Sequence, residues 1–338
     1  MDSELYGSDA PLVFIRPIGL DAADSLRLMQ AAQQLGEKVR WRLAPVGVQA
    51  DVYLAHRANV VVGAQPTRPQ LNDSLQSPST LNSTYEHAHI YLSEEGYYKN
   101  QPVCLLGNAP DTDRGTLDSS YLPALQFPMV LEELRLGLYS VQEQLIGLRV
   151  MYALGRHAWL ERKRWQTHNL HVIDAATLIA VIEPLHWQVH LSGSAHIDQI
   201  ETAATLPVPQ TNAFAAAQFD VLPLEQLLWE FAKRCPQELL DKILPSSYLR
   251  ESLTHRRITQ LSERELGDHC VAILRALDTR SRTADELQTS LRMSRPALLR
   301  ALACLALTRS IRPEKHNATM LERWSAWLPK ILRRRVVR

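Results

Sequence analysis

The stretch from Thr283 to Leu307 reads TADELQTSLRMSRPALLRALACLAL, and it decides the fold expected for the last third of the chain. Thr283 and Glu286 have the spacing of a capping box, in which the two residues exchange hydrogen bonds and begin a helix. A three-residue turn ends at Ser294, a good N-cap, and Pro296 suits the first turn of another helix. The stretch therefore predicts two helices, over 283–291 and 295–307, joined by a tight turn.

A second capping box, Ser262 to Glu265, predicts one more helix before this pair, extending to about residue 277. Leu298, Leu302 and Leu305 recur at i, i+4 and i+7, so they are expected to face a core. Residues 309–313 have the length of a short β-wing. Three helices and a wing over about residues 262–315 resemble the winged helix-turn-helix family.

In members that bind DNA, the third helix enters the major groove, and its first residues reach the bases. The resemblance therefore implies an anionic partner for the polar and basic side chains on and beside this helix. These candidates are Arg292, Ser294, Arg295, Arg300, Arg309 and Arg312. The helix carries no outward Asn or Gln that would read adenine, so its arginines would hold phosphates with little specificity. Winged helices also dock proteins or serve structure alone, and we favour that alternative over DNA contact.

The first third of the chain alternates strand-like and helix-like segments. Strands are expected at 12–15, 38–43, 51–55, 60–62, 89–92 and 103–106. A helix over 22–35 would place Leu26, Met29, Ala32 and Leu35 on one stripe. Residues 64–85 are polar and rich in Pro, Ser and Asn, as in an inserted loop. The pattern predicts an α/β domain with a parallel sheet over residues 1–145.

The last strand is followed by a proline-containing segment, Leu125-Gln-Phe-Pro128, and then by a helix expected over about 130–154. This order of elements resembles the receiver domain of bacterial response regulators. The resemblance implies a flavodoxin-like sheet. A phosphorylatable receiver needs an acidic pair, an acceptor aspartate and a lysine. The matching positions here hold Arg16 and Pro17, His56 or Arg57, and Gly107 and Asn108. Without clustered carboxylates there is no magnesium site, so we expect a pseudo-receiver that is not phosphorylated and acts by docking.

The helix that leaves this domain carries an apolar residue alternately every third and fourth position. These residues are Leu131, Leu134, Leu138, Val141, Leu145 and Leu148. Such a seam fits a dimer, but a single helix that packs on its own sheet needs the same side chains. Both interpretations stay open.

The middle of the chain, residues 146–235, is expected to form a small β-rich domain. Strands are predicted at 170–173, 178–182, 187–191 and 214–221, followed by a helix that starts near Pro223. That helix should bury Leu224, Leu227, Leu228 and Phe231. The pair His168 and His171 lacks further metal ligands, and the serines before His196 lack a nucleophile elbow. No catalytic or metal-binding residue is predicted.

Charge is distributed unevenly, although the whole chain sums to +1. Residues 1–145 carry net −7, residues 146–235 net −1, and the winged-helix segment 236–338 net +9. A basic third points to an anionic partner, which includes the acidic third itself. A basic amphipathic helix is expected at the end, over 319–335.

These features together predict a three-domain bacterial signalling protein of the cytoplasm, with no enzymatic activity, no cofactor and no transmembrane segment. The first hypothesis is an adaptor that docks protein partners. The second is a transcription regulator that binds DNA through the winged helix. The third is a receptor for a cyclic dinucleotide, based on the basic clusters Arg162-Lys-Arg164 and His255-Arg-Arg257.

Overall fold

The chain divides into two compact units, residues 1–146 and 147–338, and each is described by itself. The computed structural model describes residues 10–18, 20, 22–35, 38–45, 48, 50–56, 60–62, 90–92, 97–98, 101–106, 135, 138–139, 141–143, 145–210, 218–256 and 261–314. The predicted insertion at 64–85, the segment around Pro128, Gly107 and Asn108, and the basic helix at 319–335 lie outside these residues. Within the described part, no helix is long and apolar enough to cross a membrane.

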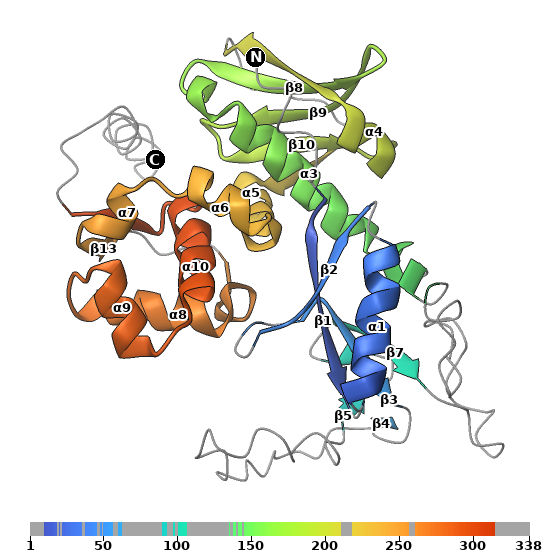
Figure 1. The fold of residues 1–338 in the computed structure, drawn as a ribbon. Coiled ribbons are helices and arrows are strands. Elements are labelled where there is room, and N and C mark those ends of the chain that lie inside the picture. Colours follow the sequence, from blue (N-terminus) through green and yellow to red (C-terminus); the bar gives the residue numbers. More distant parts are fainter. Residues whose placement is uncertain are drawn as a thin grey trace. The chain divides into compact units, whose positions relative to one another are not determined.

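The first unit contains a mainly parallel sheet in the strand order β2-β1-β3-β7-β6 (Figure 1). Its strands are β1 (Leu12–Ile18), β2 (Arg40–Leu43), β3 (Val52–His56), β6 (Tyr97–Tyr98) and β7 (Gln101–Leu106). Only β6 runs antiparallel to its neighbour, and β4 (Val60–Val62) pairs separately with β5 (Ile90–Leu92). A strand buried on both faces, as β1 is over Leu12–Ile15, suits the centre of a parallel sheet.

Helix α1 (Ala22–Gln34) follows β1, and the structure agrees with the predicted buried stripe only in part. Ala32 is buried and Met29 and Leu35 are half-buried, but Leu26 is 60% exposed. Leu28 and Ala31 are buried in addition, so the centre of the buried face lies to one side of the predicted stripe. Alanines fit on a buried or an exposed face, and the sequence pattern therefore left the exact orientation of this helix undetermined.

The second unit contains an antiparallel sheet in the strand order β11-β8-β9-β10-β12. Its strands are β8 (His168–Asp174), β9 (Thr177–Glu183), β10 (Gln188–Ser192), β11 (Ala204–Pro209) and β12 (Phe219–Pro223). The mixed α/β composition is thereby confirmed. Strand β11 was not predicted, because its prolines disfavour a strand, but prolines are accepted at a sheet edge.

Two helices share a core with this sheet, α3 (Ile146–Leu160) and α5 (Leu224–Arg234). The four residues predicted for the buried stripe of α5 are all fully buried. Gly155 of α3 lies against α5 so closely that an added Cβ would come within 2.3 Å of the Leu227 carbonyl oxygen. The glycine thus permits the two helix backbones to touch. The short helix α4 (Ile197–Thr202) and the 3-10 helix η3 (Arg162–Arg164) complete this part.

The two-residue turn between β8 and β9 stores backbone strain. Ala175 and Ala176 have φ of 42° and 72°, a region that costs roughly 1 kcal/mol per residue when a Cβ is present. Asn-Gly is the preferred pair for such a turn. The double variant Ala175→Asn, Ala176→Gly is therefore expected to raise the free energy of unfolding by about 1 kcal/mol, measured by urea denaturation.

The matched control is Ala272→Gly inside helix α8 (Glu263–Thr279). Glycine in a helix interior costs about 1 kcal/mol, so this variant should lose stability. A loss in the turn variant as well would show that the turn is not strained.

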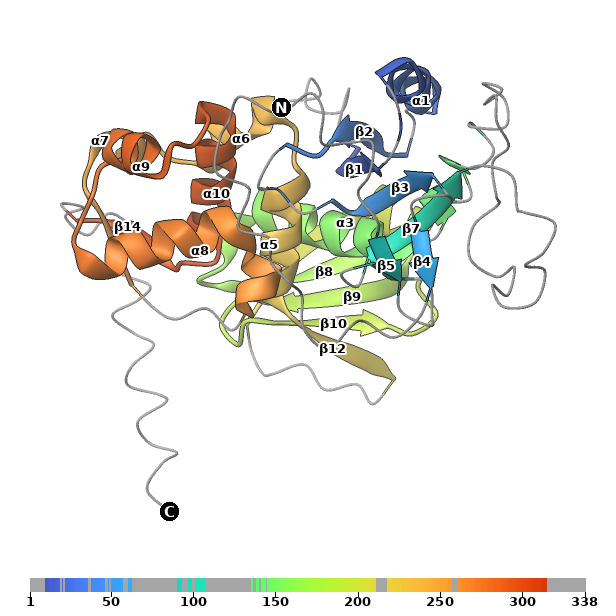
Figure 2. The same cartoon turned by 90° about the horizontal axis from the view of Figure 1, so that it is seen from below.

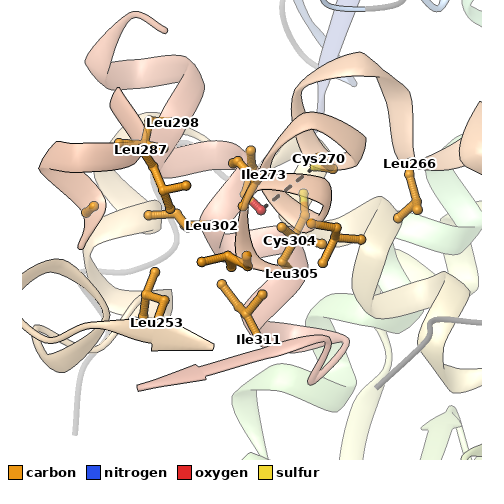
Figure 3. Close-up of a cluster of buried hydrophobic side chains, with 14 of the residues drawn as sticks. Leu253, Leu266, Cys270, Ile273, Leu287, Leu298, Leu302, Cys304, Leu305 and Ile311 are labelled. Carbon is orange, nitrogen blue, oxygen red and sulfur yellow. Dashed lines mark hydrogen bonds between the residues drawn. The ribbon is translucent and has the colours of Figure 1, made fainter. Parts of the chain in front are cut away.

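The remaining helices form the part that was predicted as a winged helix. They are α6 (Gln237–Ile243), α7 (Ser247–Arg250), α8, α9 (Ala284–Leu291) and α10 (Arg295–Leu307). Both capping boxes are present, and Ser294 accepts a hydrogen bond from the Ala297 amide at the start of α10. The predicted wing contains β14 (Ile311–Pro313), which pairs with the unpredicted β13 (Leu253–His255). Figure 3 shows the core that these elements enclose, with Leu298, Leu302 and Leu305 inside it.

Helix α10 also packs against α6 and against α5, and α5 belongs to the segment predicted as the middle domain. Leu307 packs against three apolar clusters of the unit's described residues. The segments 146–235 and 236–338, expected as separate domains, thus lie together, and from residue 147 onward they form one compact unit.

Candidate functional site

Helix α10 is the element on which the winged-helix prediction depends, and it is buried on more than one side. Every residue from Ala301 to Leu305 is buried. Leu302 and Leu305 face the core with α8 and α9, whereas Ala303 packs into a cluster with Phe231 of α5. A helix buried all round in its middle has no free face there for a DNA groove.

Arg300, a predicted anion contact, is instead bound within the chain. Its Nη1 donates hydrogen bonds to the carbonyl oxygens of Lys233 and Cys235, at 2.9 and 2.8 Å. These carbonyls lie at the C-terminal end of α5, where unpaired acceptors and the helix dipole favour a cation. Arg300 therefore positions α10 against α5.

Arg309, another predicted contact, lies over the ring of Trp187 in the β9–β10 turn, at 4.4 Å from the ring centroid. Both residues have positive φ, 59° and 56°. Trp187 also makes an edge contact with Trp165. The cation–π contact connects the wing to the sheet.

The other four predicted residues remain at the surface. Arg292, with φ 51°, ends α9 and is exposed, as are Ser294 and Arg312. Arg295 is 40% exposed and pairs with Asp285 at 3.0 Å. The six candidates are thus divided between surface positions and contacts inside the unit.

A shallow hollow of about 420 Å³ lies on the outer side of α9 and of the segment before it. It is lined by Arg280, Arg282, Asp285, Glu286, Thr289 and Ser290. The hydrogen bond from the Thr283 amide lowers the pKa of Glu286, and Arg280 and Arg282 add to this effect. Glu286 is therefore ionised at neutral pH, and the hollow presents both signs of charge together with hydroxyl groups. Sequence reasoning missed it, although both arginines stand directly before the capping box.

The histidines of the sheet are held within the fold. His157 is buried, and its Nε2 donates to the carbonyl oxygen of Ile200 while the Thr205 hydroxyl donates to Nδ1. Burial lowers the pKa of His157, which keeps it neutral for this pair of bonds. In the described ranges, no group of three or more His, Cys, Asp or Glu side chains is placed to hold a metal ion.

Glu183 is the buried carboxylate of this sheet, with a side chain 1% exposed. It accepts a hydrogen bond from Asn169 and lies 3.2 and 3.3 Å from ring nitrogens of His190 and His186. These partners supply the polar contacts that a buried carboxylate requires.

Ser194 and His196, which were weighed as catalytic residues, have local roles. His196 caps α4 through a capping box with Gln199. The hydroxyls of Ser192 and Ser194 lie 3.0 Å apart. The His196 amide donates to the Gln199 side chain, and the His196 carbonyl oxygen accepts from the Gln199 amide, so this residue serves as the start of a helix.

Cys235, Cys270 and Cys304 are buried free thiols. Burial raises the pKa of Cys235 and of Cys304 to about 12. A thiol with such a pKa is not a nucleophile at neutral pH.

The leucine seam lies only partly within the described residues, because Leu131 and Leu134 are outside them. Leu138, Val141 and Leu145 are buried in the single chain, and Leu148 is half-buried. Side chains already buried leave little surface for a second copy.

The two basic clusters predicted as a cyclic-dinucleotide site, Arg162-Lys-Arg164 and His255-Arg-Arg257, lie on different elements. Arg162 of η3 lies 4.3 Å from the ring centroid of Trp159, and His255 of β13 pairs with Asp278. Each cluster thus has a residue engaged within its own part of the unit.

No protein-family model, no curated protein and no solved structure matches the chain.

Proposed function

We propose that this chain is a non-enzymatic signalling adaptor that docks a protein partner through the outer surface of α9 and the hollow beside it. The burial of α10 on two sides carries this proposal. Because α10 packs against both α5 and the core formed with α8 and α9, its role is to stabilise the unit. Binding of a partner is therefore assigned to the neighbouring exposed surface of α9.

The charges around the hollow fit a protein better than a polyanion. Arg280 and Arg282 stand beside Asp285 and Glu286, and a phosphate backbone would be repelled by the two carboxylates. A protein surface with both signs of charge can complement such a site. Thr289 and Ser290 are exposed, and their hydroxyl groups donate to carbonyl oxygens of α9, so toward a partner they offer hydrogen-bond acceptors.

The first unit supports a docking role of the pseudo-receiver kind. The order β2-β1-β3 with parallel pairing is the start of the flavodoxin-like order. Arg16, at one position of the acidic pair, donates hydrogen bonds to the carbonyl oxygens of Pro45 and Val48. A guanidinium in this place opposes binding of a divalent cation.

DNA binding stays the second candidate, because Arg292 and Ser294 are exposed at the beginning of α10. Most of the positive charge in the last third, however, lies outside α10. Residues 315–338 carry net +6 of the +9 in the last third. Any DNA affinity is therefore expected to come from the C-terminal arginines rather than from α10.

A DNA titration of the full chain, measured by fluorescence anisotropy at several salt concentrations, tests this division. We expect binding within the non-specific range, with Kd of roughly 10⁻⁴–10⁻⁶ M at physiological salt, for every duplex sequence. The triple variant R333Q/R334Q/R335Q should make the affinity for DNA less dependent on salt concentration. The double variant R292A/R295A should leave that dependence unchanged. Arg300 is left intact because its change would disturb α5.

Tight binding to one duplex sequence that is lost in R292A/R295A would overturn the docking proposal in favour of DNA. The positive test is a photo-crosslinking residue placed at Thr289, with Gln188 of β10 as the matched exposed position on the sheet. A protein captured at Thr289 alone must then bind the purified chain, and the charge reversal R280E/R282E should weaken that binding by about tenfold or more. Unchanged binding in R280E/R282E would place the interface elsewhere.

A further inference from the structure

The turn between α9 and α10 holds an arginine in a backbone conformation that favours glycine. Arg292 has φ of 51° and ψ of 39°, in the left-handed region. The amide of Met293 donates to the carbonyl oxygen of Gln288 at 3.1 Å, which is the hydrogen bond of a Schellman motif. Glycine is the usual residue at the position of Arg292 in this motif, because a Cβ in the left-handed region costs free energy. Strained residues of this kind gather at functional sites.

The described part of the fold makes no use of the Arg292 side chain. This side chain is exposed, and among the residues that the structure describes it forms no hydrogen bond and no ion pair. Arg309, which also has positive φ, differs in this respect, because it stacks on the ring of Trp187. The strain at Arg309 accompanies a contact inside the unit, whereas no such contact accounts for an arginine at position 292.

The carboxylates of the α9 surface already have other basic neighbours. Asp285 pairs with Arg295 at 3.0 Å, and Glu286 lies beside two further arginines at the hollow. Arg292 is one of four arginines in residues 280–295, a segment that holds only these two carboxylates and carries net +2. Positive charge is therefore in excess on this surface, and a partner of complementary charge is acidic.

The position of Arg292 continues the surface already assigned to docking. Figure 2 shows α10 between α5 and α9, which places α9 at the border of the second unit. The exposed residues Asp285 and Thr289 of the hollow are one helical turn apart on α9. Arg292 follows Thr289 by roughly 5 Å along the helix axis. A partner that covers Thr289 can therefore also reach Arg292.

We propose that the α9 surface binds an acidic segment of the partner protein, and that Arg292 determines this specificity by pairing with an aspartate or glutamate of that segment. A guanidinium can donate two parallel hydrogen bonds to one carboxylate, which fixes the orientation of the bound segment. The proposal rests on the docking function given above and adds the chemistry of the partner.

The test uses the full chain with the substitutions R333Q/R334Q/R335Q, so that the C-terminal arginines do not bind the probe. The probes are two short labelled peptides, one of alternating glutamate and serine and one of alternating glutamine and serine. Fluorescence anisotropy at low salt should show tighter binding of the acidic peptide. Arg292→Gln is expected to weaken that binding by about fivefold, the upper range for an exposed ion pair. Arg164→Gln on η3, where Arg164 is 54% exposed, is the matched control and should leave it unchanged.

A stability measurement separates this role from a structural one. Arg292→Gly removes the backbone strain together with the charge. In urea denaturation it should lower the unfolding equilibrium constant about fivefold compared with R292Q, while both variants bind the acidic peptide equally weakly. A loss of stability in both variants relative to the unmodified chain would show that the arginine serves the fold, and would overturn the proposal.

The proposal and the docking function on which it rests fail in different ways. If R280E/R282E weakens binding of the acidic peptide and R292Q does not, the docking surface stands and the role of Arg292 is refuted. Equal binding of the two peptides would refute an acidic partner, although crosslinking at Thr289 could still identify a docked protein. If neither R280E/R282E nor R292Q alters binding and nothing is captured at Thr289, the docking function fails as well.

Discussion

Replacing Gly155 by alanine is expected to lower the free energy of unfolding by about 3 kcal/mol, the upper end of the usual cost of overpacking. An alanine Cβ would lie 2.3 Å from the Leu227 carbonyl oxygen and 2.7 Å from the Phe231 Cβ. Both are far below van der Waals contact, and a backbone atom cannot rotate away. The helices α3 and α5 must separate, and the core with the sheet opens with them.

The control is Gly147→Ala on the same helix. Nothing lies within 4 Å of a Cβ at this position, and alanine is the better helix former by about 1 kcal/mol. This variant should be slightly more stable than the parent in urea denaturation. Equal losses at both positions would mean that the close approach of α3 and α5 is not what requires glycine at 155.

Replacing Arg149 by methionine is expected to cost about 2 kcal/mol, the order of magnitude for hydrogen bonds to a charged group, because the Glu201 carboxylate left behind is 32% exposed and keeps contact with water. Arg149 is 1% exposed, and its guanidinium forms two hydrogen bonds with the Glu201 carboxylate, at 3.0 and 2.7 Å. Methionine keeps the apolar length of the side chain but leaves the carboxylate without its partner. The pair connects α3 to α4, so α4 should become more open to proteolysis and hydrogen exchange.

Arg275→Met is the matched control, because Arg275 pairs with Glu263 while both side chains are about 70% exposed. An exposed pair contributes about 0–1 kcal/mol, so this change should be small. If R149M were no more destabilising than R275M, the contribution of the Arg149–Glu201 pair to folding would be refuted.

Local signals in the sequence were sufficient to predict where each helix of the three-helix core begins. The capping boxes at Ser262 and Thr283 are present as predicted, because their hydrogen bonds join residues only three positions apart. The buried stripe of α5 could also be predicted from the sequence, since large leucines at helical spacing lie on one face of the helix and only that face can be buried. Helix α1 shows the limit, because its alanines fit either face and the predicted stripe included Leu26, which is exposed.

What the sequence by itself determined is the local structure, namely the helix starts, most strands and the spacing of the core leucines. The tertiary structure alone decided what the candidate residues do. Arg300 binds carbonyl oxygens more than sixty positions away at the end of α5, and Arg309 stacks on Trp187. Burial and hydrogen bonding of a surface-type residue depend on segments remote in the chain. The spacing around α10 therefore resembled a DNA-reading helix, whereas its packing against α5 favours a structural one.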